Sequence, residues 1–128
     1  MFKRTWMAAA LVALAACTAA PIYNVQDQPI TTASGTAPSS PDVRTAILQA
    51  GAALGWQMRD VKPGLMEGEL HLRTHSAVVD IPYNSKSYSI VYKSSTNLDE
   101  SGGNIHKNYN GWIHNLQQGI NARLSALR

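Results

Sequence analysis

AVVDIPYNSKSYSIVYK, residues 77–93, is the stretch of sequence that decides the fold. Its apolar side chains recur at every second position, first at Ala77, Val79, Ile81 and Tyr83 and then at Tyr88, Ile90 and Tyr92. Successive side chains of a strand point to opposite faces, so this period of two predicts two half-buried strands. Asn84-Ser85-Lys86 between them is turn chemistry, and the stretch as a whole predicts an antiparallel hairpin.

The residues before this hairpin extend the sheet. Trp56–Arg59 alternates in polarity, Lys62-Pro63-Gly64 is typical of a turn, and Leu65–Thr74 reads as a further strand. Together with the hairpin, these segments predict an antiparallel sheet of three or four strands. Ser94–Gly103 follows as a polar loop.

Two amphipathic helices flank the predicted strands. The first begins after Ser40, which can cap it, and stops before Gly55. Its apolar stripe follows a 4, 3, 4 spacing at Val43, Ile47, Ala50 and Leu54. The second begins near Asn104, and its stripe contains Ile105, Tyr109, Trp112, Leu116, Ile120 and Leu127. This second helix is also rich in asparagine, a poor helix former, which indicates a polar surface under some constraint.

These elements predict an α+β domain over residues 41–128. We expect a two-layer sandwich in the order α-β-β-β-β-α, with both helices on one face of the sheet, because both apolar stripes are then buried. The opposite, polar face would carry Gln57, Arg59, Glu67, Glu69, His71, Arg73, Asp80 and Lys93.

The amino-terminal segment has the pattern of an export signal. Lys3 and Arg4 precede an apolar stretch, Trp6–Leu14, which is too short to span a bilayer. Leu14-Ala15-Ala16-Cys17 then follows, the branched, small, small, cysteine order of a lipobox. We therefore expect residues 1–16 to be a lipoprotein signal peptide, with Leu14, Ala15 and Ala16 recognised by the peptidase and Cys17 lipidated. An ordinary secretory signal cut near Ala15 or Ala20 is the alternative.

Residues 17–40 are predicted to be the lipidated cysteine followed by a flexible tether. Thr, Ala, Ser and Pro dominate this segment, and a 23-residue coil would reach roughly 25 Å. Ile22, Tyr23 and Val25 form a small apolar cluster within it. Thr18 stands where an aspartate would favour the inner membrane, so we expect anchoring to the outer membrane, facing the periplasm.

Charge and cysteine content exclude several classes of protein. From Cys17 onward, nine Lys and Arg face eight Asp and Glu, so the mature chain is nearly neutral and has no electrostatic basis for binding nucleic acid. Cys17 is the only cysteine, which excludes an intramolecular disulfide.

Few residues suggest a catalytic or metal site. His71 and His75 would lie ~13 Å apart on one strand, too far to share a metal ion. Glu67 and Glu69 share a strand face, where a solvated charged surface is the more common explanation. His106 and Asn110 lie one helical turn apart and can touch. His106 is a candidate for capping or ordering the loop at Gly102-Gly103, and both residues are candidates for contacting a ligand or partner. We expect no metal and no cofactor.

The segments that carry a family resemblance are Gly55-Trp56, Pro63-Gly64, Ile81–Tyr83, Tyr88–Tyr92 and Ile105–Ile113. They resemble small, mostly uncharacterised proteobacterial lipoproteins, and the pattern Ile-His-x-x-Tyr-Asn-x-Trp-Ile is the most distinctive. The resemblance implies a lipid-anchored envelope protein and assigns no catalytic residues.

The sequence therefore favours a non-catalytic binding or assembly module. Its expected partners are the membrane, through covalent lipid, and an envelope protein or cell-wall component. The alternative is a hydrolase acting on cell wall or lipid, with Glu67, Glu69, His71 or His106 as acid or base.

Overall fold

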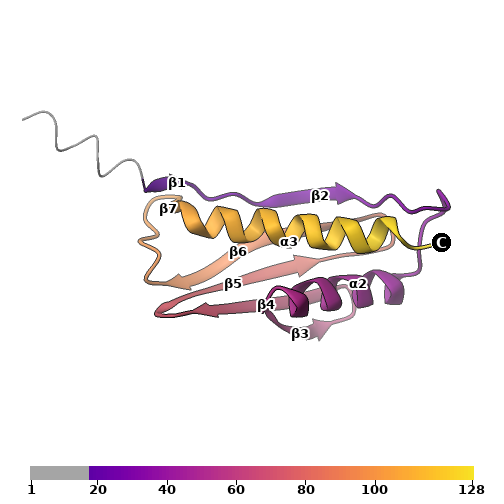
Figure 1. Cartoon of the computed structure of the whole chain (residues 1–128), viewed down its shortest axis with the longest axis horizontal. Coiled ribbons are helices and arrows are strands. Elements are labelled where there is room, and N and C mark those ends of the chain that lie inside the picture. The colour runs from indigo at the N-terminus through magenta and orange to yellow at the C-terminus, as the bar shows by residue number, and fades with distance from the viewer. Residues whose placement is uncertain (1–17) are drawn as a thin grey trace, which may run out of the picture.

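The computed structural model describes residues 18–128 of the chain (Figure 1). The predicted signal peptide, its recognition residues Leu14, Ala15 and Ala16, and the lipidation site Cys17 lie outside the described residues. In chain order, the elements are β1 (Ala19–Pro21), β2 (Val25–Pro29), α2 (Ser40–Ala53), β3 (Gln57–Lys62), β4 (Leu65–Leu72), β5 (His75–Pro82), β6 (Ser87–Thr96), β7 (Asn104–His106) and α3 (Lys107–Ser125).

The strands form two antiparallel sheets. The larger has five strands in the order β2-β6-β5-β4-β3, and β1 pairs with β7 in a separate two-stranded sheet. The predicted hairpin is confirmed, since Val79 and Asp80 of β5 face Tyr92 and Val91 of β6. The fold is therefore mixed α and β, as predicted, but two strands precede the first helix and a short strand precedes the second.

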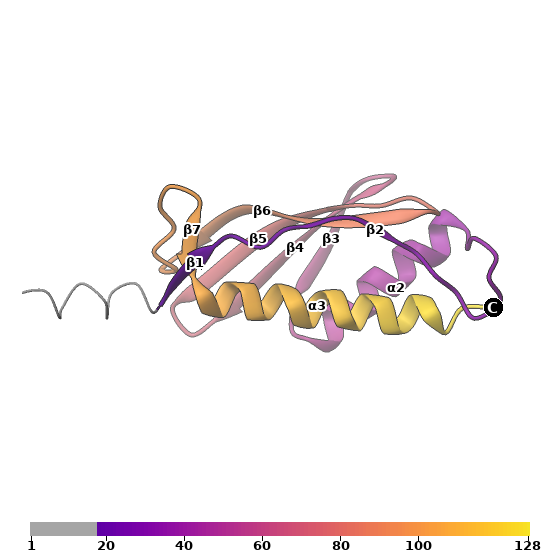
Figure 2. The same ribbon diagram turned by 90° about the horizontal axis from the view of Figure 1, so that it is seen from above.

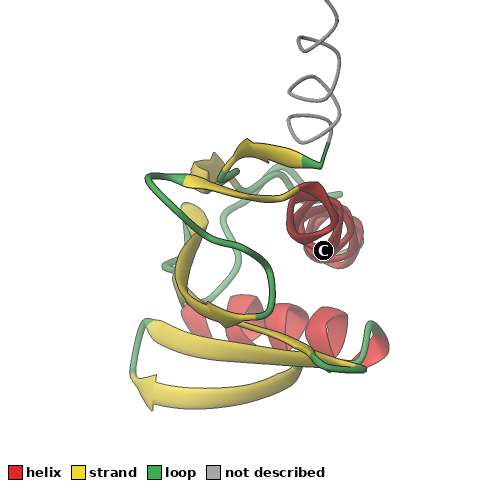
Figure 3. Ribbon diagram, turned by 90° about the vertical axis from the view of Figure 1, so that its left-hand side faces the viewer, coloured by secondary structure: helices red, strands yellow, loops and turns green. Residues whose placement is uncertain are grey.

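Both helices lie on the concave side of the curled five-stranded sheet (Figures 2 and 3). The core between them takes every second side chain of the central strands, including Met66, Val79, Ile81, Tyr88 and Ile90. The helices contribute Val43, Ile47, Tyr109, Ile113, Leu116, Ile120 and Leu124, all at most 1% exposed. Leu72, which strand alternation places on the same face as Met66, is 48% exposed because it ends β4 at the turn.

The helix boundaries differ slightly from the expected ones. Helix α2 is capped by Ser39 rather than Ser40, since the Ser39 hydroxyl accepts a hydrogen bond from the Asp42 N–H at 3.1 Å. Gly55 follows its end with φ +89°, a conformation that glycine adopts without strain, as predicted. Helix α3 begins at Lys107 and not near Asn104, because residues 104–106 pair with β1.

The prediction of a flexible tether over residues 17–40 is wrong for much of its length. Residues 19–21 and 25–29 are strands, and Val25 is 3% exposed in the core. The apolar cluster at Ile22, Tyr23 and Val25 is the physical reason, because these side chains pack against the domain. We call residues 18–30 the strap, since they run along α3 from its first residue toward its last (Figure 1).

Within residues 18–128, neither helix is both long and apolar enough to cross a bilayer.

Candidate functional site

The strap is held by one polar stripe of α3. Asn110, His114, Gln117 and Asn121, which we call the polar stripe, follow a 4, 3, 4 spacing and fall within about 60° of the helix circumference. The stripe runs beside the buried apolar stripe that contains Ile113 and Leu116. One side of α3 thus faces the core, and the neighbouring side faces the strap.

Every residue of the polar stripe contacts the strap or its neighbouring strand. Asn110 uses both ends of its amide, since Oδ1 accepts from the Tyr23 N–H and Nδ2 donates to the Pro21 carbonyl, each at 2.9 Å. The ring of Tyr23 stacks on His114, and its hydroxyl donates to Gln117 Oε1 at 2.8 Å.

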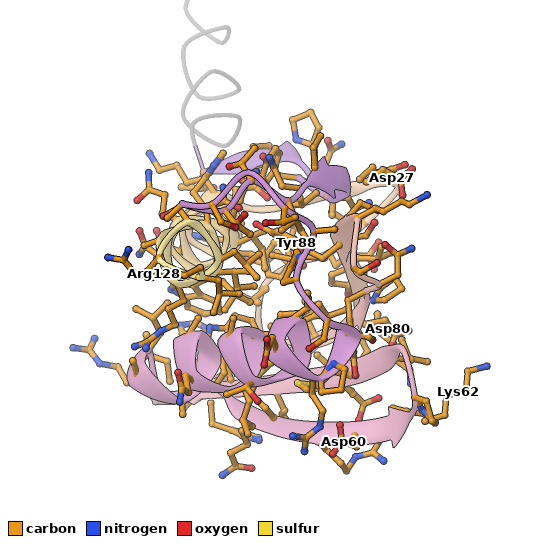
Figure 4. The ribbon with its side chains drawn as sticks, turned by 90° about the vertical axis from the view of Figure 1, so that its right-hand side faces the viewer. Asp27, Asp60, Lys62, Asp80, Tyr88 and Arg128 are labelled. Carbon is orange, nitrogen blue, oxygen red and sulfur yellow. The ribbon has the colours of Figure 1, made fainter. Side chains whose placement is uncertain are left out.

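The far half of the stripe continues the same pattern. Gln117 Nε2 donates to Gln28 Oε1 at 2.9 Å. The hydroxyl of Tyr88, on the adjacent strand β6, donates to Asn121 Oδ1 at 2.6 Å. Tyr88 lies in the middle of the molecule (Figure 4), and burial raises its pKa well above the ordinary tyrosine value. The stripe thereby joins the strap, the sheet and the last helix.

The two residues predicted as ligand or partner contacts make contacts within the chain. His106 caps α3, its Nδ1 accepting from the Asn108 N–H at 3.1 Å, while its own N–H donates to the Leu98 carbonyl at 2.8 Å. Asn110 clamps the strap as described. Both His106 contacts are thus made within the chain, to the first turn of α3 and to Leu98, and both amide atoms of Asn110 bond the strap.

The sequence reading missed Tyr23, His114, Gln117 and Asn121. Two signals pointed toward them. The polar positions of the last helix repeat with helical spacing, and the apolar cluster of the supposed tether is what a packed segment requires. Neither signal identifies the partner of the other, because the strap and α3 lie almost ninety residues apart.

The open face of the sheet carries most of the predicted charged residues, several of them in an ion-pair network, but Arg73 lies in the turn after β4 because that strand ends at Leu72. Glu67, 15% exposed at its side chain, pairs with Lys93 at 2.7 Å and with Arg59 at 2.5 Å. Hydrogen bonds from these two cations, Lys93 first, hold the pKa of Glu67 below its ordinary value. A carboxyl group held ionised in this way is poorly suited to act as a general acid.

The remaining candidates on the sheet do not converge. Glu69 pairs with His71 on the same strand. His75 lies on β5 and not on the same strand as His71, since β4 ends at Leu72 and the register sets Leu72 against His75. Its Nδ1 is 2.8 Å from the Asn97 carbonyl oxygen. Among residues 18–128, no group of three or more His, Cys, Asp or Glu is placed to hold a metal ion.

A cleft of about 390 Å³ with mostly apolar walls lies beside the start of α2. Pro41, Pro63 and Tyr83 contribute to its lining, and Arg44 and Asp60 form a two-bond ion pair there, with Nε–Oδ1 at 2.9 Å and Nη2–Oδ2 at 2.5 Å. The pair lowers the pKa of Asp60 and raises that of Arg44. Apolar walls with a few fixed polar groups are typical of binding clefts. The end of β3 and the start of α2, which flank this cleft, lie in the half of the molecule away from β1 (Figure 1).

Comparisons with protein-family models, curated proteins and solved structures gave no match for this chain.

Proposed function

We propose that this protein is a lipid-anchored lipoprotein of the bacterial cell envelope. The observation that carries the proposal is Leu14-Ala15-Ala16-Cys17, placed directly after a basic start and a short apolar stretch. The cysteine thiol takes a diacylglyceryl group, and cleavage makes Cys17 the first residue. Two or three acyl chains, each contributing ~0.8 kcal/mol per buried CH₂, hold a protein on a membrane firmly.

The proposed location is the outer membrane, with the domain in the periplasm. Thr18, rather than aspartate, after the cysteine supports this choice over retention at the inner membrane. We also propose that the mature domain is a two-layer module, one layer of helices on a sheet whose other face stays open. The alternation of buried and partly exposed residues along β4 and β5 supports that layering.

The proposed role is binding or assembly rather than catalysis, with an envelope protein or cell-wall component as partner. The cleft beside the start of α2 is the surface that we favour, because it combines apolar walls with a fixed ion pair. The hydrolase alternative gains no support from the geometry. Glu67 is paired with two cations, Glu69 with His71, and His106 caps a helix in a different part of the fold.

Intact-mass analysis of the membrane-extracted protein tests the anchor. We expect a product that begins at Cys17 and carries the added mass of diacylglycerol and of a further acyl chain. Cys17→Ser should accumulate as an unprocessed precursor without lipid. A mature product with a free thiol, or one cut at another residue, would refute the anchor.

Photo-crosslinking in intact cells tests the binding role. A photoreactive residue at Lys62, which lines the cleft, should give a reproducible adduct with one envelope component. The same residue at Arg128, which does not line this cleft, is the matched control. Equal labelling patterns at both positions would remove the cleft from consideration.

A further inference from the structure

One end of the molecule contains the point where the described chain begins. It is built from β1, β7, the loop of residues 97–103 and the β4–β5 turn at residues 73–74, and we call it the anchor end. Figures 1 and 2 both place these segments at the same end of the molecule. The free ends of β2 and α3 and the cleft beside α2 lie at the opposite end, which we call the far end.

Hydrogen bonds make the anchor end a single ordered body. The Thr18 carbonyl accepts from the Lys107 N–H at 2.8 Å, and the Ile22 N–H donates to the Gly103 carbonyl at 2.9 Å. Asn97 Nδ2 donates to the Thr74 carbonyl at 2.9 Å, which joins the loop to the β4–β5 turn. The chain is therefore fixed to the domain from residue 18 onward.

This order leaves almost no slack for an anchor at Cys17. Consecutive Cα atoms are about 3.8 Å apart, so a lipidated Cys17 would lie one peptide unit from Thr18. A free tether of 23 residues would instead have allowed roughly 25 Å. Helix α3, with 19 residues, extends about 28 Å away from the anchor end.

We propose that the folded domain lies directly on the phospholipid surface, with its anchor end against the headgroups and its far end pointing into the aqueous space. The inference rests on the proposed lipidation of Cys17. It adds a fixed orientation of the domain. In this orientation the cleft beside α2 faces away from the membrane, and its distance from the lipid surface is roughly the length of α3.

The chemistry of the anchor end fits a headgroup layer. With Lys107, the first residue of α3 beside this end, its exposed charges are Arg73, Lys107, Asp99 and Glu100. Two are of each sign, so it has no net charge to repel either anionic or zwitterionic lipid. Leu72, which is 48% exposed, adds an apolar side chain next to the turn. The short chain between the lipidated cysteine and the domain, and not charge, thus holds this end on the lipid. The contact should therefore be insensitive to salt.

Depth-dependent fluorescence quenching tests the orientation. The lipidated protein is placed in vesicles of phosphatidylethanolamine and phosphatidylglycerol that contain headgroup nitroxide lipids. Lipidation consumes the only cysteine of the chain, so an introduced cysteine can be labelled alone. Leu72→Cys and Ser101→Cys report on the anchor end, and Lys62→Cys and Lys86→Cys report on the far end. We expect quenching several-fold stronger at the anchor end, at both low and high salt.

A spacer variant supplies the matched control. About 20 Gly and Ser residues inserted between Cys17 and Thr18 would give a reach of roughly 25 Å, and the difference between the two ends should disappear. The same insertion at Gly35, where no atom lies within 4 Å of an added Cβ, should leave the difference intact.

Intact mass measured on the same samples separates the two proposals. Protein that carries lipid on Cys17 but is quenched equally at both ends would overturn the orientation and leave the anchor standing. Protein without lipid would overturn the anchor itself. Loss of the anchor-end quenching at high salt would show charge-driven contact and would contradict attachment by chain length.

Discussion

The ring of Tyr23 lies over the ring of His114, with centroids 4.1 Å apart and planes inclined by 21°. This stack joins a residue of the strap to the last helix. It helps to fix the strap, residues 18–30, to the folded domain. The polar stripe of α3 is therefore a structural element of the fold. Substitutions in this stripe should lower the stability of the protein.

Asn110→Ala should destabilise the protein by about 1–3 kcal/mol, because it leaves the Tyr23 N–H and the Pro21 carbonyl without their partner. Urea unfolding of the mature protein in detergent measures this. Asn115→Ala is the matched control on the same helix, since Asn115 is exposed, and alanine should be neutral or slightly stabilising there. Equal losses of stability in both variants would contradict a specific role of Asn110 in holding the strap.

Tyr109→Phe and Tyr88→Phe should have opposite effects. The Tyr109 hydroxyl is buried and has no hydrogen-bond partner among the described residues, so its removal should be neutral or stabilising. Tyr88→Phe should cost about 1 kcal/mol, because it takes the donor from Asn121 Oδ1. Thermal unfolding of both variants decides the matter, and a larger loss for Tyr109→Phe would reveal a partner for that hydroxyl.

Stability should fall in alkali. Burial raises the pKa of Tyr88 and of Tyr109 above the unfolded value of 10.0. Below pH 10 the folded and the unfolded protein both keep the hydroxyl protons of the two tyrosines. Above pH 10 the unfolded chain loses these protons first. Stability should therefore decline with rising pH, by about 1.4 kcal/mol per pH unit for each buried tyrosine, until the folded pKa is reached. Denaturant unfolding across this range measures the slope, and the Tyr88→Phe/Tyr109→Phe double variant should lack it.

Glu67→Gln should lower stability at neutral pH by up to about 1 kcal/mol, because it removes the partner of Lys93 and Arg59. The pKa of Glu67 is held below its unfolded value of 4.5, so its contribution is present above that pH. It is lost as the pH falls through the folded pKa. The difference between wild type and variant should thus shrink in acid. A difference that stays constant down to the acid limit would show that packing, not charge, is responsible.

Two helical glycines should respond differently to alanine. At Gly51 an added Cβ would lie 2.5 Å from Met58 Sδ, so Gly51→Ala should destabilise unless Met58 moves. At Gly111 nothing lies within 4 Å, and Gly111→Ala should stabilise by up to about 1 kcal/mol. Guanidinium unfolding compares them, and Met58→Ala should relieve the Gly51→Ala defect. A stabilising Gly51→Ala would mean that the methionine side chain repacks freely.

Much of the fold was predictable from local patterns. The alternation in residues 77–93 predicted the β5–β6 hairpin, and the 4, 3, 4 spacing of apolar residues predicted both helices. Polar residues of the open sheet face, such as Glu67 and Asp80, were also placed correctly, because strand alternation assigns faces without knowledge of distant contacts. The candidate contacts His106 and Asn110 were identified as a pair, but their partners were not.

The sequence by itself determined most of the secondary structure of residues 41–128 and most of its buried faces, since periodicity is a property of neighbouring residues. The exceptions are the strand β7 and the exposed side chains of Leu54 and Leu72. It also contains the lipobox on which the proposed anchor depends. Tertiary structure alone decided the place of the strap and the meaning of the asparagines in α3. A short segment such as Ala19–Pro29 has no pattern strong enough to define a strand alone. Its hydrogen bonds exist only when β6, β7 and α3, remote in sequence, are already in position to supply the partners.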